Sequence, residues 1–187
     1  EVAPEIVAIE VGDEAPLFGL DSIMYERFVL GDRLDSLREV EGLIVLDFWA
    51  TWCEPGKREL PVFEKIYKEL REQNIHLYTI SIDPVRKNLW QYVKINNSFT
   101  LPILWDPNAA QAAQKYGAHE ILPQLFIIDA NRIVRCKHVG EIKNLEAVLK
   151  AELEKIKPGS FPDFKDVKLQ SGESSDKKSH APAPQAK

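Results

Sequence analysis

The feature that most constrains the fold is a buried strand that runs directly into a cysteine-containing turn and a helix. Residues 43–50 are apolar or aromatic apart from Asp47, which is typical of a strand buried on both faces in the middle of an α/β sheet. The segment 52–55, Trp-Cys-Glu-Pro, follows at once. Apolar residues then recur at helical spacing to about residue 74, so we expect an amphipathic helix that begins at the cysteine.

Strand-like and helix-like segments alternate along the rest of the chain. Asp83 and Asp106 each precede a proline, which is typical of a helix cap followed by the first helical residue. Before the strand at 43–50 we expect an irregular or strand-like segment to about residue 30 and a short helical turn at 36–38. The spacing predicts further strands at 75–82, 101–105, 125–128 and 133–139, and helices at 84–97, 108–116 and 144–157. This alternation predicts an α/β domain with a mixed sheet.

Length and composition predict one domain with two flanking segments. A chain of 187 residues is a normal size for a single domain. We assign residues 1–10 to an N-terminal lead-in and residues 11–157 to the domain. Residues 158–187 are rich in Pro, Ser, Lys and Ala, and this composition predicts a disordered C-terminal tail.

The charge balance argues against several classes of partner. The 24 basic and 29 acidic residues give a net charge of -5, and no dense basic run occurs, so we expect no nucleic acid partner. No segment has the ~18 consecutive apolar residues of a membrane helix. The chain starts at Glu1 without a methionine, so we expect that an N-terminal piece was removed, which leaves room for a lost signal peptide or membrane anchor.

The histidines and cysteines show no metal-binding pattern. The four histidines are scattered, and neither Cys53 nor Cys136 lies at metal-ligand spacing from them. Two cysteines also do not make a disulfide scaffold. We therefore expect no metal and no cofactor.

The cysteine turn and four features around it resemble the thioredoxin superfamily. Asp47 lies six residues before Cys53, Pro61 lies in the following helix, Pro123 opens a later strand in the manner of the family's cis-proline, and Gly140 closes the last strand. The resemblance implies a thioredoxin-like α/β fold, with a central mixed β-sheet flanked by helices.

The length between the motif and the proline narrows the resemblance. Seventy positions separate Cys53 from Pro123, which fits an extra α/β unit near 84–105, inserted between the active-site helix and the cis-proline. Together with the run Trp-Cys-Glu-Pro-x-Lys-Arg-Glu-Leu-Pro, this makes the chain similar to the TlpA/ResA-like branch. That branch implies a monomeric, periplasmic or otherwise extracytoplasmic thiol-disulfide oxidoreductase that acts on protein thiols, as in cytochrome c maturation.

The chain departs from this family at the second motif cysteine, where Gly56 stands. Cys53 could form a mixed disulfide with a substrate, but no motif thiol could resolve it. Three explanations stay open: an engineered trapping substitution, a natural single-cysteine member that depends on an external reducing thiol, or a protein that has lost redox function. The pair Leu122-Pro123 also replaces the family's commoner Thr-Pro or Val-Pro, which leaves the substrate preference open.

The residues around the turn can be given expected roles. A thiol at a helix N-terminus is stabilised as a thiolate, so we expect a lowered pKa for Cys53, with Lys57 contributing. Asp47, buried by its apolar neighbours, is expected to have a raised pKa and to act as a proton acceptor. Cys136 is the one internal candidate for a substitute resolving thiol, although a mid-strand cysteine is more often a packed small residue.

The expected substrate surface comprises Trp52, Pro55, Leu122 and Pro123. The resemblance implies that the backbone of Leu122, beside a cis-proline, pairs with an extended substrate segment, while Trp52 offers an exposed apolar platform. The alternative for Trp52 is core packing.

Three other functions compete with the oxidoreductase. A redox-inactive thioredoxin-fold module that binds protein segments would explain Gly56, but would have no need of the Trp-Cys-x-Pro turn. A peroxiredoxin is disfavoured because Ala50 and Leu46 occupy the positions of its threonine and proline. A monothiol glutaredoxin is disfavoured because Cys-Gly-Phe-Ser is absent. The sequence therefore favours an oxidoreductase with Cys53 as nucleophile.

Overall fold

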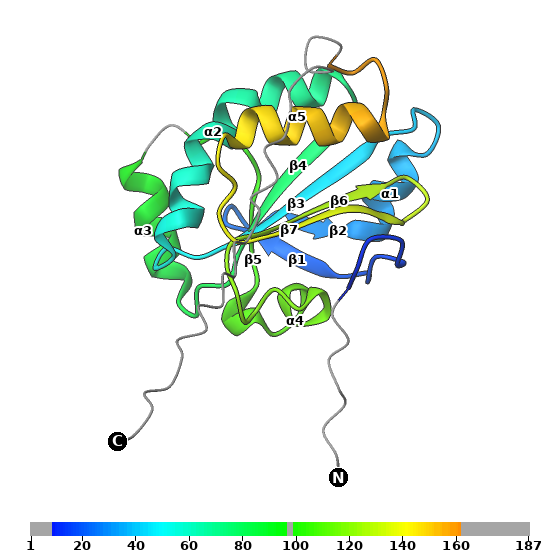
Figure 1. Ribbon diagram of the computed structural model, residues 1–187. Coiled ribbons are helices and arrows are strands. Elements are labelled where there is room, and N and C mark those ends of the chain that lie inside the picture. Colours follow the sequence, from blue (N-terminus) through cyan, green and yellow to red (C-terminus); the bar gives the residue numbers. More distant parts are fainter. Residues whose placement is uncertain (1–8, 97–98, 162–187) are drawn as a thin grey trace, which may run out of the picture.

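A seven-stranded mixed sheet forms the centre of the protein (Figure 1). The computed structural model describes residues 9–96 and 99–161, so most of the predicted lead-in and tail lies outside the described residues. The strand order is β2-β1-β5-β4-β3-β6-β7, with β3 parallel to β4 and antiparallel to β6, as a mixed sheet requires. The strands are β1 (Gly19–Ser22), β2 (Arg27–Val29), β3 (Leu43–Trp49), β4 (Ile75–Ser81), β5 (Ile103–Trp105), β6 (Gln124–Asp129) and β7 (Val134–Val139).

Helices cover both faces of this sheet. They are α1 (Leu30–Leu37), α2 (Glu54–Glu72), α3 (Arg86–Ile95), α4 (Ala112–Tyr116) and α5 (Leu145–Ile156), with a short 3-10 turn η1 (Pro107–Ala109). Figure 1 shows α2 and α5 side by side on one face and α4 on the other. The helix and strand expected near 84–105 are present as α3 and β5. Among the described residues, none of the helices has the length and apolarity to cross a bilayer.

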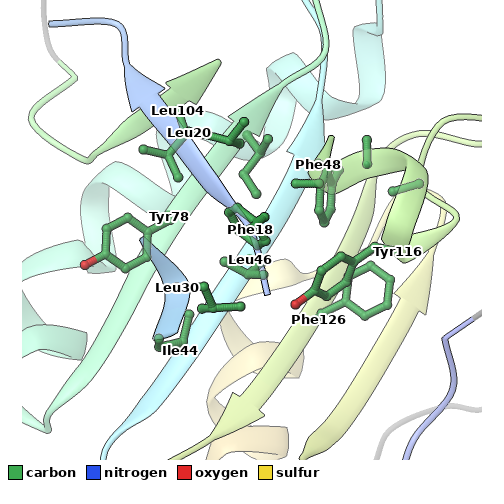
Figure 2. Packing of buried hydrophobic residues seen from close by; sticks show 14 of the residues in the cluster. Phe18, Leu20, Leu30, Ile44, Leu46, Phe48, Tyr78, Leu104, Tyr116 and Phe126 are labelled. Atoms are coloured by element: carbon green, nitrogen blue, oxygen red, sulfur yellow. The ribbon is translucent and has the colours of Figure 1, made fainter. Parts of the chain in front are cut away.

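The alternating side chains of β3 feed two apolar clusters, one on each face of the sheet. All seven residues of this strand are buried, which confirms the prediction from its composition. Val45 and Trp49 pack toward α2 and α5, and Phe48 packs toward α1 and α4. On that second face, the ring centroids of Phe48 and Tyr116 are 5.5 Å apart, and those of Tyr116 and Phe126 are 5.1 Å apart (Figure 2). The packed rings hold β3 rigidly under the cysteine turn.

The segment before β3 is more regular than the sequence predicted. It forms the strands β1 and β2 and a helix of 8 residues, α1, where only a short turn was expected. The side chains of Leu30, Leu34 and Leu37 are buried on one side of this helix. Packing of this leucine stripe against β3 stabilises a helix that is too short to form by itself in water.

The prediction that Asp83 caps the next helix is wrong. Helix α3 begins at Arg86, with Val85 in the capping position, and the Asp83 carboxylate instead accepts hydrogen bonds from Thr51 and Ser81. A capping residue and a tertiary acceptor have the same chemistry, so the sequence pattern could not separate them.

The helix predicted at 108–116 is divided in two. Asn108 and Ala109 have positive φ angles of 56° and 53°, which ends η1 before α4 begins. The carboxylate of Asp106 accepts the backbone N–H groups of Gln111 and Ala113 at 3.0 and 2.8 Å. Asp106 therefore provides hydrogen-bond acceptors for N–H groups at the start of α4, across the break, rather than capping one continuous helix.

Candidate functional site

Cys53 lies at the junction of β3 and α2, where it occupies the N-cap position of the helix. Its N–H donates to the Ala50 carbonyl and its own carbonyl accepts the Lys57 N–H, each at 3.0 Å. Pro55 fits the first turn of the helix, where a missing N–H costs nothing. The side chain of Cys53 is only 7% exposed. The thiol thus stands at a helix N-terminus, as predicted, but largely withdrawn from solvent.

The turn before the thiol is held by Asp83. This carboxylate is 2% exposed and accepts the Thr51 N–H at 2.9 Å, the Thr51 hydroxyl and the Ser81 hydroxyl at 2.6 Å. Because all three donors converge on one buried carboxylate, the backbone that leads into Cys53 has little freedom. Sequence reasoning missed this role for Asp83, which depends on the end of β4 lying beside the end of β3.

Two carboxyl groups are buried close to the thiol. Asp47 is fully buried, and neither of its carboxyl oxygens has a hydrogen-bond partner among the described residues. Glu59 is 4% exposed, and its Oε1 accepts the Ile142 N–H at 2.9 Å. Burial raises the pKa of Asp47, as predicted, and the charge of Glu59 raises it further. Burial raises the pKa of Glu59 to about 7.

The sequence contained a signal for Glu59 that the analysis did not use. In α2 the buried positions follow one stripe, and Glu59 falls within it, between Gly56 and Phe63. A charged residue in the middle of an apolar helix stripe is unusual, because burying a charge is costly unless the group is neutralised or paired. Such a residue is therefore a candidate for a shifted pKa and a functional role.

The structure contradicts the prediction that the pKa of Cys53 is lowered. Burial raises the pKa of the Cys53 thiol, and the carboxylates of Glu59 and Asp47 raise it further. A hydrogen bond from the Gly56 N–H and the charge of Arg58 act in the opposite direction but are the weaker influence in sum. The prediction counted the helix terminus and left out the effect of the two buried acids on the pKa of the thiol.

Gly56 lies where a second thiol would face the first. A Cβ atom built on Gly56 would stand 3.6 Å from the Cys53 Sγ, so a thiol at this position would lie beside that of Cys53. The same Cβ would lie 2.9 Å from the Cβ of Trp49, closer than such atoms normally approach. The glycine thus removes the partner thiol and lets the first turn of α2 approach β3 closely.

The loop before β6 lies at the same end of the sheet as the cysteine turn, because Gln124 pairs with Phe48. The Leu122–Pro123 peptide bond is cis, and the Gly140 N–H donates to the Pro123 carbonyl at 2.8 Å. Leu122 packs against the apolar cluster that includes Cys53. Trp52, the residue before the cysteine, is 62% exposed, so it is not part of the core. Trp52, Leu122 and Pro123 thus lie at the end of the sheet that carries the thiol.

The two remaining accessory candidates lie differently. Lys57 forms an ion pair with Glu54 within the first turn of α2. Cys136 packs with the side chains beneath α5, in the cluster on the other face of the sheet from that of Cys53. Both cysteines are free, and burial raises the pKa of Cys136 to about 12. Cys136 is thus an inert, packed thiol rather than part of the site.

Metal binding has no support within residues 9–96 and 99–161. In this part of the chain, no three side chains of His, Cys, Asp or Glu come together as potential ligands.

Comparison with known proteins connects this site to a family. Residues 11–137 match the AhpC/TSA family. The thiol-disulfide oxidoreductase ResA of Geobacillus thermodenitrificans is 30% identical over 82% of this chain and 82% of its own length. The thioredoxin-like protein YneN of Bacillus subtilis is 28% identical over 79% of this chain and 82% of its own length.

Solved structures show the same fold. A putative thiol:disulfide interchange protein DsbE from Chlorobium tepidum matches with a TM-score of 0.69 and 21% identity, over 80% of this chain and 99% of its own. The predicted thioredoxin-like fold is therefore confirmed. The chain belongs to the AhpC/TSA family of thioredoxin-like proteins, in which its relatives include the ResA thiol-disulfide oxidoreductases.

Proposed function

We propose that this protein is a thiol-disulfide oxidoreductase that acts on protein thiols or disulfides, with Cys53 as its nucleophile. The observation that carries the proposal is the position of Cys53 at the start of α2, at the end of the sheet where the cis-proline loop enters β6. The activity named for the ResA relative agrees with this chemistry. The backbone of Leu122 and the exposed ring of Trp52 would bind the substrate segment, with Pro55 shaping the turn.

The first step is thiol-disulfide exchange. The Cys53 thiolate attacks one sulfur of a substrate disulfide, a new sulfur–sulfur bond forms, and the substrate bond breaks. The electron pair leaves on the second substrate sulfur, which takes up a proton. Glu59, with a pKa of about 7, is suited to receive the proton that Cys53 loses, and Asp47 contributes to the same buried acid pair.

Completion of the cycle requires a thiol from outside the chain. Gly56 offers no sulfur, and Cys136 lies in the cluster on the opposite face of the sheet from Cys53. An external reducing thiol would attack the mixed disulfide, release the reduced substrate sulfur and bond to Cys53, and a second external thiol would then free Cys53.

The place of action follows from the resemblance alone. The TlpA/ResA-like branch implies an extracytoplasmic monomer, periplasmic in bacteria with two membranes, with cytochrome c maturation as the process served. The single domain at 11–157 belongs to the same proposal. Fractionation of the source cells with an antibody to the protein tests the location.

A redox-inactive module that binds protein segments is the second candidate. The missing second thiol favours it, and so do the burial and raised pKa of Cys53. Exposed apolar side chains in and beside the loop before β6 would serve such a module equally well, with Ile121 54% and Val139 50% exposed. The peroxiredoxin alternative is not supported, because Ala50 and Leu46 are both wholly buried and supply no polar group to the site.

Reaction with glutathione disulfide tests the proposal. We expect the intact protein to gain one glutathione per chain at pH 8, on the peptide that contains Cys53, and to lose it when dithiothreitol is added. Cys136→Ser should gain the same adduct, and Cys53→Ser should gain none. If Cys53 stays unmodified while the unfolded chain reacts, the binding module becomes the better function.

A further inference from the structure

A separate cavity lies at the far end of α2 from Cys53. Its volume is about 430 Å³, and it is bordered by the first residues of β4. Strand β4 pairs with β5 only from Thr79 onward, so within the described residues its edge before Thr79 stays open on this side. Arg71, which lines the cavity, comes 18 residues after Cys53, about 27 Å along the helix at 1.5 Å per residue. The cavity is therefore distinct from the thiol site.

Two helices on opposite faces of the sheet each contribute an arginine to this cavity. Arg33 comes from α1 and Arg71 from the last turn of α2. Among the described residues, no carboxylate lies within ion-pair distance of either guanidinium. Arg33 stands 5.9 Å from the centre of the Tyr78 ring, and Arg71 donates to the Tyr67 hydroxyl at 3.4 Å.

The other charged residues of the cavity do not cancel these two arginines. Arg27 also lines the cavity, but it is paired at 3.2 Å with Asp21, which is not part of the lining. Glu26 is the one acidic side chain in the lining among residues 9–96 and 99–161, and its side chain is exposed. The cavity therefore carries an excess of positive charge.

Two neutral hydrogen-bonding groups face the same space. His76 and Tyr78 are alternate residues of β4 and share one face of the strand. In the described part of the chain, the two ring nitrogens of His76 have no hydrogen-bond partner. The Tyr78 hydroxyl has none there either. Figure 2 shows this hydroxyl directed away from the labelled core residues. Burial lowers the pKa of His76 to about 4, with the charges of Arg33 and Arg71 as further causes.

We propose that this cavity binds a small organic anion, with an apolar or aromatic body that carries a carboxylate or phosphate group. The planar guanidinium groups of Arg33 and Arg71 match both head groups, since each can be bound by paired N–H donors. Phe28, Val93 and Phe99 supply apolar wall for the body of the ligand. A volume of about 430 Å³ is normal for a small-molecule site with a few converging polar groups.

Calorimetric titration of the full chain tests the site. The probes are phenyl phosphate and benzoate, with inorganic phosphate to test the body and neutral benzamide to test the charge. We expect phenyl phosphate or benzoate to bind with one site, more tightly than inorganic phosphate, and benzamide not to bind. Whichever of the two binds more tightly identifies the head group.

Variants locate the binding. Arg33→Gln and Arg71→Gln should each weaken the binding about tenfold, as expected for the loss of a charge-assisted hydrogen bond. Arg38→Gln is the matched control, because Arg38 follows α1 but pairs with Asp35 and does not line the cavity. Cys53→Ser should bind unchanged, which keeps this result independent of the redox function.

The ring signals of His76 give a second readout that does not depend on affinity. On saturation with the tighter probe, the His76 ring resonances should move, while those of His138 on β7 should not. Absence of binding by both phenyl phosphate and benzoate would overturn the proposal. Equal weakening by Arg38→Gln, or inorganic phosphate binding as tightly as phenyl phosphate, would also overturn it.

Discussion

The two ends of α2 carry opposite electrostatic environments. At the N-terminal end, the acids Asp47 and Glu59 lie buried near Cys53, and burial raises the pKa of both. At the C-terminal end, the bases Arg71 and His76 line a cavity, and burial lowers the pKa of His76 to about 4. Desolvation is the common cause, since it disfavours the charged form of an acid and of a base alike. Both ends retain ionisable groups where apolar residues would be more stable, as is typical of sites with a function.

This contrast gives the two ends opposite dependence of stability on pH. The folded-state pKa of Glu59 lies above its ordinary value of 4.5, so the stability it confers at low pH is lost as the pH rises to about 7. The folded-state pKa of His76 lies below its ordinary value of 6.5, so stability is lost as the pH falls toward about 4. The predictions below test each end in turn.

The largest effect is expected from Gly56→Cys, which supplies the thiol end with its missing partner. The new Cβ would lie 3.6 Å from the Cys53 Sγ, so oxidation should close a disulfide between positions 53 and 56. An intramolecular thiol resolves a mixed disulfide far faster than an external one, so we expect about a thousandfold faster release of the substrate. Stopped-flow measurement with a fluorescent peptide disulfide gives the rate.

Gly56→Ala is the control for the steric part of this change. It brings the same close approach to the Trp49 Cβ without a thiol, and should lower the free energy of unfolding by about 1–3 kcal/mol, as overpacking does. A Gly56→Cys protein that folds but keeps free thiols at both positions 53 and 56 under oxidant would show that the site geometry is wrong.

Glu59→Gln should remove the alkaline loss of stability. Glutamine can still accept the Ile142 N–H but carries no charge, so the variant should be more stable than the parent at pH 8 by about 3 kcal/mol and equal to it at pH 4. The same change removes a negative charge near Cys53, so the pH at which Cys53 alkylation reaches half its maximal rate should fall. Urea unfolding and peptide mass spectrometry measure the two effects, and an unchanged pH profile in both would refute the assignment.

Asp83→Asn should separate the two ends of α2. An asparagine keeps only one acceptor oxygen. It loses either the hydrogen bond from the Thr51 hydroxyl to Oδ1, or those from the Thr51 N–H and the Ser81 hydroxyl to Oδ2, at a cost of about 2 kcal/mol in the free energy of unfolding. Alkylation of Cys53 should change, whereas binding of phenyl phosphate at the distant cavity should not. Asp35→Asn is the matched control, because Asp35 is exposed and its partner Arg38 does not line the cavity. A change in phenyl phosphate affinity would mean that the two ends are coupled.

His76→Gln should have the smallest effect, on the acid side. The parent loses stability as its unfolded state binds a proton that the folded His76 does not, and glutamine removes this difference. We compare the free energy of unfolding of the variant with that of the parent at two pH values. After allowance for solvent screening, this difference should favour the variant by about 1–2 kcal/mol more at pH 4.5 than at pH 8. Thermal unfolding across this pH range measures the gain, and a constant difference at every pH would contradict the lowered pKa of His76.

The buried strand, the cysteine turn and the long helix were predictable because their signals are local. Asp47 is the one polar residue among the seven of β3, and α2 has a clear apolar stripe. These elements therefore occur where the sequence predicted them. Helix α1 and the break at Asn108 were not predictable in the same way. The first depends on packing against β3 and the second on a backbone conformation that common residues adopt only when their surroundings require it.

The sequence by itself determined the fold class and the position of the one motif thiol, because hydrophobic periodicity and a cysteine before a helix are properties of neighbouring residues. Only the tertiary structure decided the electrostatics. Asp83 holds the turn at Thr51 because the ends of β3 and β4 lie side by side, and Arg33 and Arg71, from two helices distant in the chain, line one cavity. A pKa depends on burial and on charges brought near in space, which spacing along one chain does not specify.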